Sequence, residues 1–491
     1  MRFLPWLILT IFSSVSLLAS QALENRLESL EDQIQKLQKE HTALQDDYAD
    51  MNDILELVER KSILDSMNLN AELQLRLDSF AYDSRYIEGE NTPDYKADPH
   101  GGIQRRDEFT KNFDPASMVR FRFNLSAHLL EDLSFHGRLV MVRSSQSYQR
   151  LCILSQDIKS ADAVTAFDVD RAYFDYKFNK DSRYPMVLSA GVLPTTGGTP
   201  VQYGEFNVRQ SLYPALVFDM DSYGLIVTTN ISNLLNQESF IRAIMARAYT
   251  LNPNIYPYQC NRENIDNAEI YGLFVDTRFS EKSLFSMGLN YLNNVKAHPY
   301  LGPNISTEDA HVLGSMMTLG MGLDIESIGQ TPLSVFLHTA LSMPDGNGKK
   351  DDYQIDPNTY VDGVGFTQDN KVGYSEADYA QGTMLEDQGY SIYAGLQYAF
   401  TPEWHLGAEY NYGSQYWFAA TQGAEDMYNK LAIRGHVGET YLAWNFHENM
   451  FLKAAYMYTK EEYTGSGWHF GEPAKKDAVQ EVSYLLVNAK F

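Results

Sequence analysis

Residues 69–78 read LNAELQLRLD, in which leucine or alanine alternates with a polar side chain. Successive side chains of a β-strand point to opposite faces, so this period of two gives one apolar and one polar face. About ten residues is also the length of a tilted strand that crosses a bilayer. The stretch therefore predicts a membrane-spanning strand with one face toward lipid.

The same alternation recurs to the end of the chain and predicts sixteen strands. The expected ranges are 69–78, 117–129, 133–143, 166–178, 185–193, 221–230, 239–251, 267–279, 284–295, 312–325, 332–341, 388–400, 404–413, 431–446, 450–459 and 478–491. Short links alternate with long ones, as in outer-membrane barrels and unlike soluble β-sandwiches. We therefore expect an antiparallel, all-β transmembrane barrel of about 16 strands over residues 67–491, with both termini in the periplasm.

Hairpin geometry gives a parity test of the expected facing. Cross-strand partners must point to the same face, so the turn near Glu131 should contain an odd number of residues, most simply three. The same rule pairs Phe400 with Trp404 and Tyr398 with Leu406. It places an aromatic pair at the periplasmic interface.

Residues 1–22 have the composition of a cleaved secretory signal peptide. Arg2 precedes an apolar run from Phe3 to Ala19, and the small residues Ser20 and Ala22 follow. A membrane anchor is the alternative, but the run is short for a spanning helix. We expect export, with the barrel residing in the bacterial outer membrane.

Residues 23–66 carry apolar side chains at alternating spacings of four and three, with one polar exception at His41. The positions are Leu23, Leu27, Leu30, Ile34, Leu37, His41, Leu44, Tyr48, Met51, Leu55 and Val58. This 3.5-residue period predicts a periplasmic α-helical coiled coil that must self-associate to bury its seam. A homotrimer is the expected state; a single amphipathic helix packed on the barrel is the alternative.

Composition excludes several classes of protein. The formal charge of -25 makes nucleic acid an unsuitable partner. Cys152 and Cys260, the two cysteines, fall in expected outer loops and could form one disulfide or stay free. Phosphate-loop, HExxH, GxSxG and CxxC patterns are absent from the sequence, so we expect no enzyme activity, no cofactor and no bound metal.

A local basic wall stands out in this acidic chain, on the expected lumen face of strands 117–129, 133–143 and 166–178. Its pore-lining members are Arg120, Arg122, Arg138 and Arg171, with Lys177, His128 and His136 nearer the periplasmic end. Guanidinium groups in a narrow channel attract anions, which predicts anion selectivity. The alternative is that these arginines pair with Asp175 or with acidic loop residues. The two histidines lack a third ligand for a metal site.

Two long links suggest further roles. Residues 194–220 contain Glu205, Arg209 and Asp219, and could fold inward as a constriction or remain an ordinary outer loop. Residues 342–387 contain ten acidic and three basic residues, a net charge of -7, which suits divalent cations that bridge to lipopolysaccharide.

The segments Val169–Tyr176 (VDRAYFDY) and Gly413–Phe418 (GSQYWF) resemble a porin-like family, a domain of unknown function of epsilon-class proteobacteria. The layout of a coiled coil before a barrel is similar to that of phosphate-selective porins, which implies a trimer with a pore lined by Arg and Lys. The terminal Phe491 resembles the recognition signal of outer-membrane barrels, although Ser483 and Glu481 depart from its alternation.

These observations favour a passive diffusion channel for small hydrophilic solutes, surrounded by outer-membrane lipid and lipopolysaccharide. The alternative is a structural outer-membrane anchor or a surface adhesin with acidic extracellular loops.

Overall fold

The structure of the 491-residue chain is a computed structural model. It describes residues 25–42, 45, 67–85, 95–97, 103–105, 109–144, 166–194, 198–199, 201–206, 212–218, 221–249, 268–296, 312–347, 387–419, 430–463 and 475–491. The chain divides into two compact units, Met1–Met67 and Asn68–Phe491.

The first unit contains an α-helix over residues 25–42. Leu27, Leu30, Ile34 and Leu37 are each more than half exposed on it. No described residue of this chain therefore buries that part of the expected coiled-coil seam. Leu23 and the seam positions from Leu44 onward lie outside the described residues. Within the described ranges, no helix is both long and apolar enough to cross a membrane.

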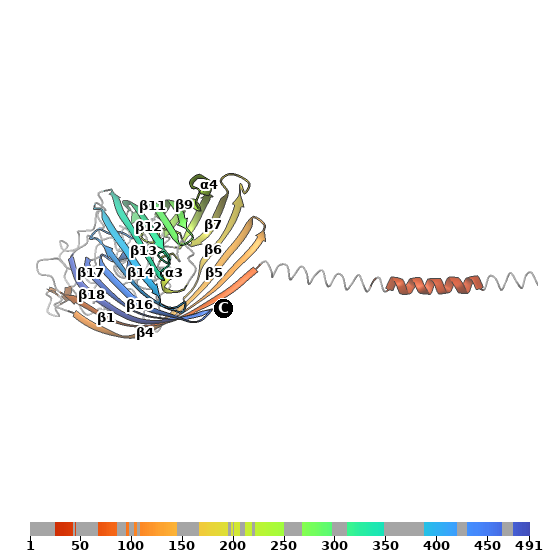
Figure 1. The fold of residues 1–491 in the computed structure, drawn as a ribbon, viewed down its shortest axis with the longest axis horizontal. Helices are drawn as coiled ribbons and strands as arrows, with labels where there is room; N and C mark the ends of the chain where they lie inside the picture. The colour runs from red at the N-terminus through yellow and green to blue at the C-terminus, as the bar shows by residue number, and fades with distance from the viewer. Residues whose placement is uncertain are drawn as a thin grey trace, which may run out of the picture. The chain divides into compact units, whose positions relative to one another are not determined.

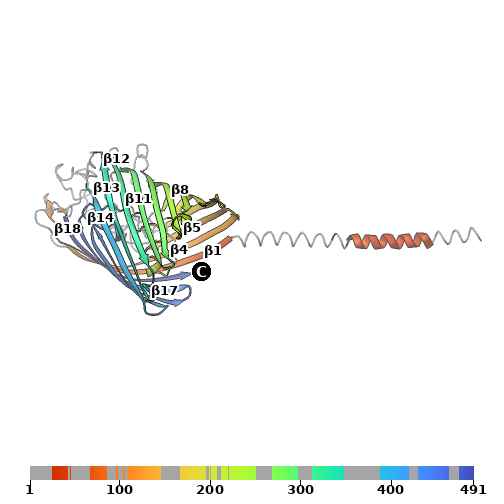
Figure 2. The same ribbon diagram turned by 45° about the horizontal axis from the view of Figure 1, so that its top comes forward.

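The second unit is a closed antiparallel β-barrel of sixteen strands. The barrel strands are β1 (Met67–Arg85), β4 (Phe109–Leu130), β5 (Leu133–Ser144), β6 (Ala166–Phe178), β7 (Met186–Pro194), β8 (Asp221–Asn230), β9 (Ser239–Tyr249), β10 (Ala268–Ser280), β11 (Ser283–Lys296), β12 (Val312–Ile325), β13 (Leu333–Gly346), β14 (Gly389–Ala399), β15 (Trp404–Gly413), β16 (Gly435–His447), β17 (Met450–Tyr463) and β18 (Lys475–Lys490). Figures 1 and 2 show these strands inclined side by side around the lumen. The predicted strand number and architecture are confirmed.

Two minor elements accompany the barrel strands. β2 (Tyr95–Ala97) and β3 (Ile103–Arg105) pair with each other in a separate small sheet. α4 (Ser232–Leu235) lies in the link between β8 and β9. That link belongs to the end of the barrel where the short connections lie and where β1 begins and β18 ends, which we call the short-turn end. The opposite end is the long-loop end.

The C-terminal residue closes the barrel. Phe491 N donates to Ala71 O at 2.8 Å, and Ala71 N donates to Phe491 O at 3.1 Å. Above this pair the β1–β18 register aligns Leu75 with Val487 and Leu77 with Leu485. Closure leaves no unpaired strand edge, which is the condition for a sheet to span a bilayer.

The first strand shows the two faces that its sequence predicted. Leu75 and Leu77 are 43% and 53% exposed, whereas Arg76 and Asp78 between them are 8% and 2% exposed. Apolar side chains therefore point outward, and polar side chains point into the lumen. This is the architecture of an outer-membrane β-barrel.

For the hairpin near Glu131, the predicted facing of the two strands is confirmed, but the predicted three-residue turn is wrong. β4 and β5 pair with the predicted facing, as in His128 opposite Ser134. Their turn has two residues, Glu131 and Asp132, because a register shift between His128 and Leu130 restores the parity that a three-residue turn would have given. In the second hairpin Phe400 N donates to Trp404 O at 2.9 Å, as expected.

The strand predicted over 431–446 begins later than expected. Residues Lys430–Ala432 form a 3-10 helix, η4, and β16 starts at Gly435. Gly435 has φ +137°, and a Cβ there would lie 2.1 Å from Lys460 O, so a side chain would be strained. The glycine lets the chain turn from a segment inside the lumen into the wall.

Candidate functional site: the barrel lumen

Two segments from the long-loop end lie inside the lumen. The first inserted segment is residues 198–199, 201–206 and 212–218, with α3 at Val201–Gly204; the second is residues 414–419 and 430–434, with η4. Tyr203 of α3 stacks on Phe336 of β13 with ring centroids 5.5 Å apart, and Figure 1 shows α3 within the ring of strands. Leu216, Val217 and Trp417 are at most 1% exposed. The middle of the lumen is therefore packed.

Polar side chains of the wall hold the first inserted segment. Ala215 N donates to His338 Nδ1 at 3.1 Å, and Thr199 Oγ1 donates to Asp324 Oδ1 at 2.6 Å. Gln397 Nε2 donates to Tyr203 O. Each contact joins segment to wall across more than a hundred residues of sequence. The inward fold is thus a tertiary arrangement, with the wall acting as its partner.

Tyr213 of the same segment packs edge-on against Phe274 of β10, with ring centroids 4.8 Å apart. Burial raises the pKa of Tyr213 to about 12, so its phenol is neutral in ordinary buffers.

A glycine in the wall makes room for this segment. A Cβ on Gly320 of β12 would lie 2.6 Å from Val217 Cγ2 and 2.6 Å from Thr339 O. Real side chains do not tolerate such contacts, so the segment and wall fit only with glycine here.

The second inserted segment is held in the same manner. Phe418 N donates to Ser342 Oγ of β13 at 3.2 Å. Within the segment, Trp417 Nε1 donates to Leu431 O at 2.9 Å, and Arg434 Nε donates to Trp417 O at 3.0 Å. These bonds join its two described parts into one packed unit.

A buried charge cluster joins the second segment to strands β15, β16 and β17. Lys430 Nζ donates to Glu409 Oε2 at 2.5 Å and to Glu439 Oε2 at 2.6 Å. Lys453 Nζ donates to Glu439 Oε1 at 3.0 Å. The two lysines balance the two glutamates, and all four are less than 9% exposed. Formal neutrality is what allows such charges to remain buried.

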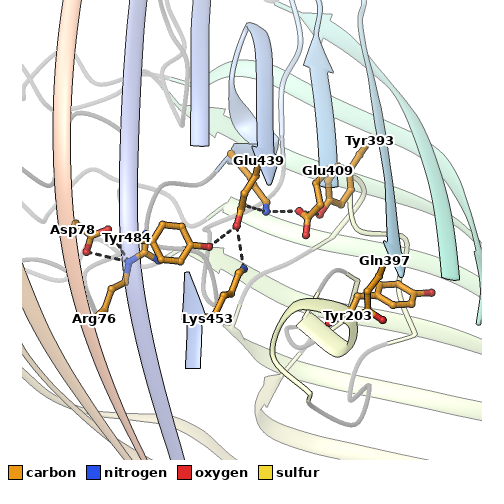
Figure 3. Close-up of polar contacts among 10 residues, drawn as sticks. Arg76, Asp78, Tyr203, Tyr393, Gln397, Glu409, Glu439, Lys453 and Tyr484 are labelled. Carbon is orange, nitrogen blue, oxygen red and sulfur yellow. Dashed lines mark hydrogen bonds and ion pairs between the residues drawn. The ribbon is translucent and has the colours of Figure 1, made fainter. Parts of the chain in front are cut away.

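Two tyrosines complete this cluster. Tyr484 of β18 donates its hydroxyl to Glu439 Oε1, and Tyr393 of β14 donates to Glu409 Oε2 at 2.7 Å. Figure 3 shows Glu439 between Tyr484 and Lys453, with Glu409 beside Tyr393. On the far side of Tyr484, Arg76 lies 3.8 Å from the ring centroid and donates to Asp78. The polar network thus extends across the β1–β18 closure.

The structure brings the four predicted arginines together on adjacent strands. Arg120 and Arg122 lie on β4, and Arg138 lies on β5 directly opposite Arg171 on β6. The first three are 7%, 5% and 4% exposed. Arg122 Nη1 lies 3.8 Å from Glu72 Oε1. These arginines therefore form one wall whose first three side chains are buried. One carboxylate partner is Glu72 of β1, which was not among the expected partners.

The other basic residues of the wall lie toward the short-turn end. His136 Nε2 is 3.5 Å from Asp175 Oδ2, and the ring of His136 stacks on Tyr173 with centroids 5.0 Å apart. His128 contacts Ser134, with 3.1 Å between Nδ1 and Oγ. Lys177 is exposed.

The two histidines are not direct register partners, because His128 pairs with Ser134 and His136 with Ser126. In the described ranges, no group of three or more His, Cys, Asp or Glu could hold a metal ion.

The remaining predicted residues are only partly described. Glu205 lies half-buried just after α3. Arg209, Asp219, Cys152 and Cys260 lie outside the described residues. The constriction role and the disulfide therefore stay predictions.

Sequence reasoning missed the charge cluster. Glu409, Glu439 and Lys453 occupy the lumen phase of their strands, so strand alternation could have placed them on the wall. Lys430 has no such signal, because it lies in a link whose path depends on tertiary contacts.

Comparison with known proteins gives low similarity to solved porin structures and no match among curated proteins. OmpT of Vibrio cholerae, in its in-vitro folded trimer form, has a TM-score of 0.42 at 11% identity over 87% of this chain and 100% of that chain. Salmonella typhi OmpF in complex with daunomycin has a TM-score of 0.42 at 11% identity over 87% and 97%. A mutant of the Rh. blastica porin has a TM-score of 0.38 at 12% identity over 87% and 100%.

One sequence family matches most of the chain. Residues 110–489, from the start of β4 to the last strand, match the family described as "Protein of unknown function (DUF3373)". The match covers more than half of the protein and nearly all of the barrel. The chain therefore belongs to the DUF3373 family.

Proposed function

We propose that the protein is an outer-membrane channel for small hydrophilic solutes, with a preference for anions. The observation that carries the proposal is the two-sided wall of a closed sixteen-strand barrel, apolar outside and charged inside. An apolar outer surface of this kind is stable in contact with the hydrocarbon core of a bilayer. Barrels of this strand number are wide enough to enclose an aqueous channel.

The proposed mechanism is a fixed steric and electrostatic filter without turnover. The inserted segments narrow the lumen, and Arg120, Arg122, Arg138 and Arg171 form one wall of it. Between low-dielectric walls their field raises the local anion concentration. Glu205 belongs to the narrowing segment, and Arg209 and Asp219 are proposed to act with it.

The proposed orientation places the short-turn end in the periplasm, as in other outer-membrane barrels. The long loops would then face outward. The composition of residues 1–22 supports their proposed removal as a signal peptide on export. The acidic link 342–387 would bind lipopolysaccharide through divalent cations.

The N-terminal helix supports a proposed homotrimer. The row formed by Leu27, Leu30, Ile34 and Leu37 is exposed on one chain, and a parallel coiled coil would bury it. Chemical crosslinking of the full chain tests this. Trimers that persist when both Leu30 and Ile34 are replaced by Asp would contradict it.

The packed lumen favours a second function, that of a membrane anchor or adhesin whose barrel does not conduct. Reconstitution of the purified protein into planar bilayers separates the two. Ohmic current steps support the channel, and a silent bilayer with correctly folded protein supports the anchor.

A further inference from the structure

The lumen wall around Lys430 has the composition of an ammonium-binding site. Glu409 and Glu439 lie directly opposite each other in the β15–β16 register, and they are 6% and 4% exposed. Like charges in directly opposed positions repel, and burial strengthens the repulsion, so the ionised pair needs a cation between its members. The ammonium of Lys430 fills that position, at 2.5 Å from one carboxylate and 2.6 Å from the other.

Wall residues position both carboxylates independently of Lys430. The hydroxyl of Tyr393 donates to Glu409, and Tyr484 and Lys453 donate to Glu439. These donors come from strands β14, β18 and β17, and each is at most 9% exposed. Such a preorganised pair of acceptors lowers the ordering cost of binding a cation.

Lys430, in contrast, belongs to the second inserted segment. It lies in η4, outside the barrel strands, and its backbone oxygen accepts a hydrogen bond from Asn411 Nδ2 of β15 at 3.0 Å. The wall thus holds this residue at two points, by its ammonium and by its carbonyl. This is the arrangement of a ligand seated in a receptor, supplied by the same chain.

We propose that Glu409, Glu439, Tyr393 and Tyr484 form a receptor for primary ammonium groups, and that Lys430 occupies it as an internal ligand. A primary alkylamine arriving from the long-loop end would compete with Lys430 and release residues 430–434 from the wall. An effect of this displacement on conduction rests on the proposed channel function. The binding of the amine does not.

The geometry favours a primary ammonium over other cations. Each carboxylate gives one oxygen to a single nitrogen, whereas a guanidinium prefers two parallel oxygens of one carboxylate. Within the described part of the chain, Glu409 Oε1 is buried and has no hydrogen-bond partner, which leaves an acceptor for a further N–H. A quaternary ammonium has the charge but no N–H to donate.

Competition with a tethered ligand sets the concentration scale. A group held on the same chain acts at an effective concentration of order millimolar, so a free amine must reach roughly millimolar levels to displace Lys430. Removing the Lys430 side chain removes this competitor. We therefore expect n-butylammonium to bind K430A at least about tenfold more tightly than it binds the wild type.

The test is titration calorimetry of the full-length protein in detergent micelles with n-butylammonium chloride. Tetramethylammonium chloride at equal ionic strength is the ligand control, and K460M is the variant control, because Lys460 lies on β17 in the phase that faces outward. We expect saturable binding of n-butylammonium to K430A and no binding of tetramethylammonium. K460M should bind n-butylammonium with the affinity of the wild type.

Equal affinity of K430A and wild type for n-butylammonium, or equal binding of both cations, would overturn the receptor. If K430A folds only when n-butylammonium is present, that rescue supports the proposal. If K430A folds with neither cation, titration of the wild type with the two cations decides. Saturable binding of n-butylammonium but not of tetramethylammonium supports the receptor, and no such binding contradicts it.

Conductance of the same samples tests the proposed channel separately. Silent bilayers with intact amine binding would remove the channel and leave the receptor standing.

Discussion

Among the described residues, the lumen wall contains two pairs of like charges in directly opposed positions, and the surroundings of the two pairs differ. Glu409 and Glu439 face each other across β15 and β16, and two buried lysines neutralise them. Arg138 and Arg171 face each other across β5 and β6, within a wall of four arginines. The glutamate pair binds an inserted segment to the wall, whereas the arginines form the wall that we propose to attract anions.

Under the proposed function, the glutamate cluster has a structural role and the arginine wall has a role in selectivity. A balanced cluster contributes stability and position, because each charge is buried with its counterion. A wall rich in one sign contributes potential, which acts on whatever passes. Changes at the glutamate pair should therefore alter folding, and changes at the arginine pair should alter selectivity.

The largest effect is expected from E439Q. Glu439 accepts from Lys430, Lys453 and Tyr484, so loss of its charge leaves buried cations undercompensated. We expect a loss of about 3–5 kcal/mol in the free energy of unfolding, measured by urea titration of the detergent-solubilised barrel. E448Q, at an exposed turn position, is the control. A loss below about 0.5 kcal/mol for E439Q would contradict the structural role of this cluster.

A smaller effect is expected from G320A, which tests whether the first inserted segment lies against β12. The new Cβ would meet Val217 Cγ2 and Thr339 O at 2.6 Å. Overpacking of this kind costs about 1–3 kcal/mol, again in urea unfolding.

G438A is the matched control for that change, because no atom lies within 4 Å of a Cβ built there. We expect its stability to be unchanged or slightly raised. Equal stability of G320A and G438A would mean that Gly320 is not enclosed by the segment and β13 as described.

The arginine pair should affect selectivity more than stability. We expect R138A and R171A together to lower the anion-to-cation permeability ratio by about two- to fivefold, since the two partly screened charges contribute about 0.5–1 kcal/mol in total. The measurement is the reversal potential in a salt gradient. R183A, in an exposed connection at the short-turn end, should leave the ratio unchanged. A similar shift in R183A would show that surface charge, and not the wall, sets selectivity.

The smallest effect is expected outside the lumen, at the β14–β15 turn. A hydrogen bond from Thr401 lowers the pKa of Glu403 below its ordinary value of 4.5. A lowered carboxyl pKa stabilises the fold above the unfolded pKa, and this contribution is lost as the pH falls through the folded pKa.

T401A should therefore raise the pKa of Glu403 toward 4.5 and reduce the acid-dependent loss of stability. Titration of the Glu403 carboxyl by NMR measures the change. An unchanged pKa would remove the hydrogen bond as its cause, and the two lumen pairs would be unaffected in either case.

Strand alternation was enough to predict the barrel. In each strand a period of two is forced by backbone geometry, so LNAELQLRLD and its successors indicated both the strand number and the facing. The end of β18 followed the same rule, and Leu485 faces outward as its phase required. The alternation of neighbouring residues is therefore enough to predict strand positions and side-chain facing.

The lumen contents could be predicted only in part. Alternation places Arg120, Arg138 and Glu409 on the inner face, but it does not say which charges meet. The path of Lys430 into the wall depends on partners distant in sequence, such as Ser342 with Phe418. The two-residue turn at Glu131 was missed for a similar reason, since a bulge changes the register without a distinct composition.

The most direct test of the account is the reversal potential of the wild-type protein in a planar bilayer under a potassium chloride gradient. We predict ohmic steps and a reversal potential whose sign reports chloride permeating faster than potassium, because the proposed arginine wall would dominate the lumen field. A reversal potential of the opposite sign, or a silent bilayer with folded protein, would contradict it.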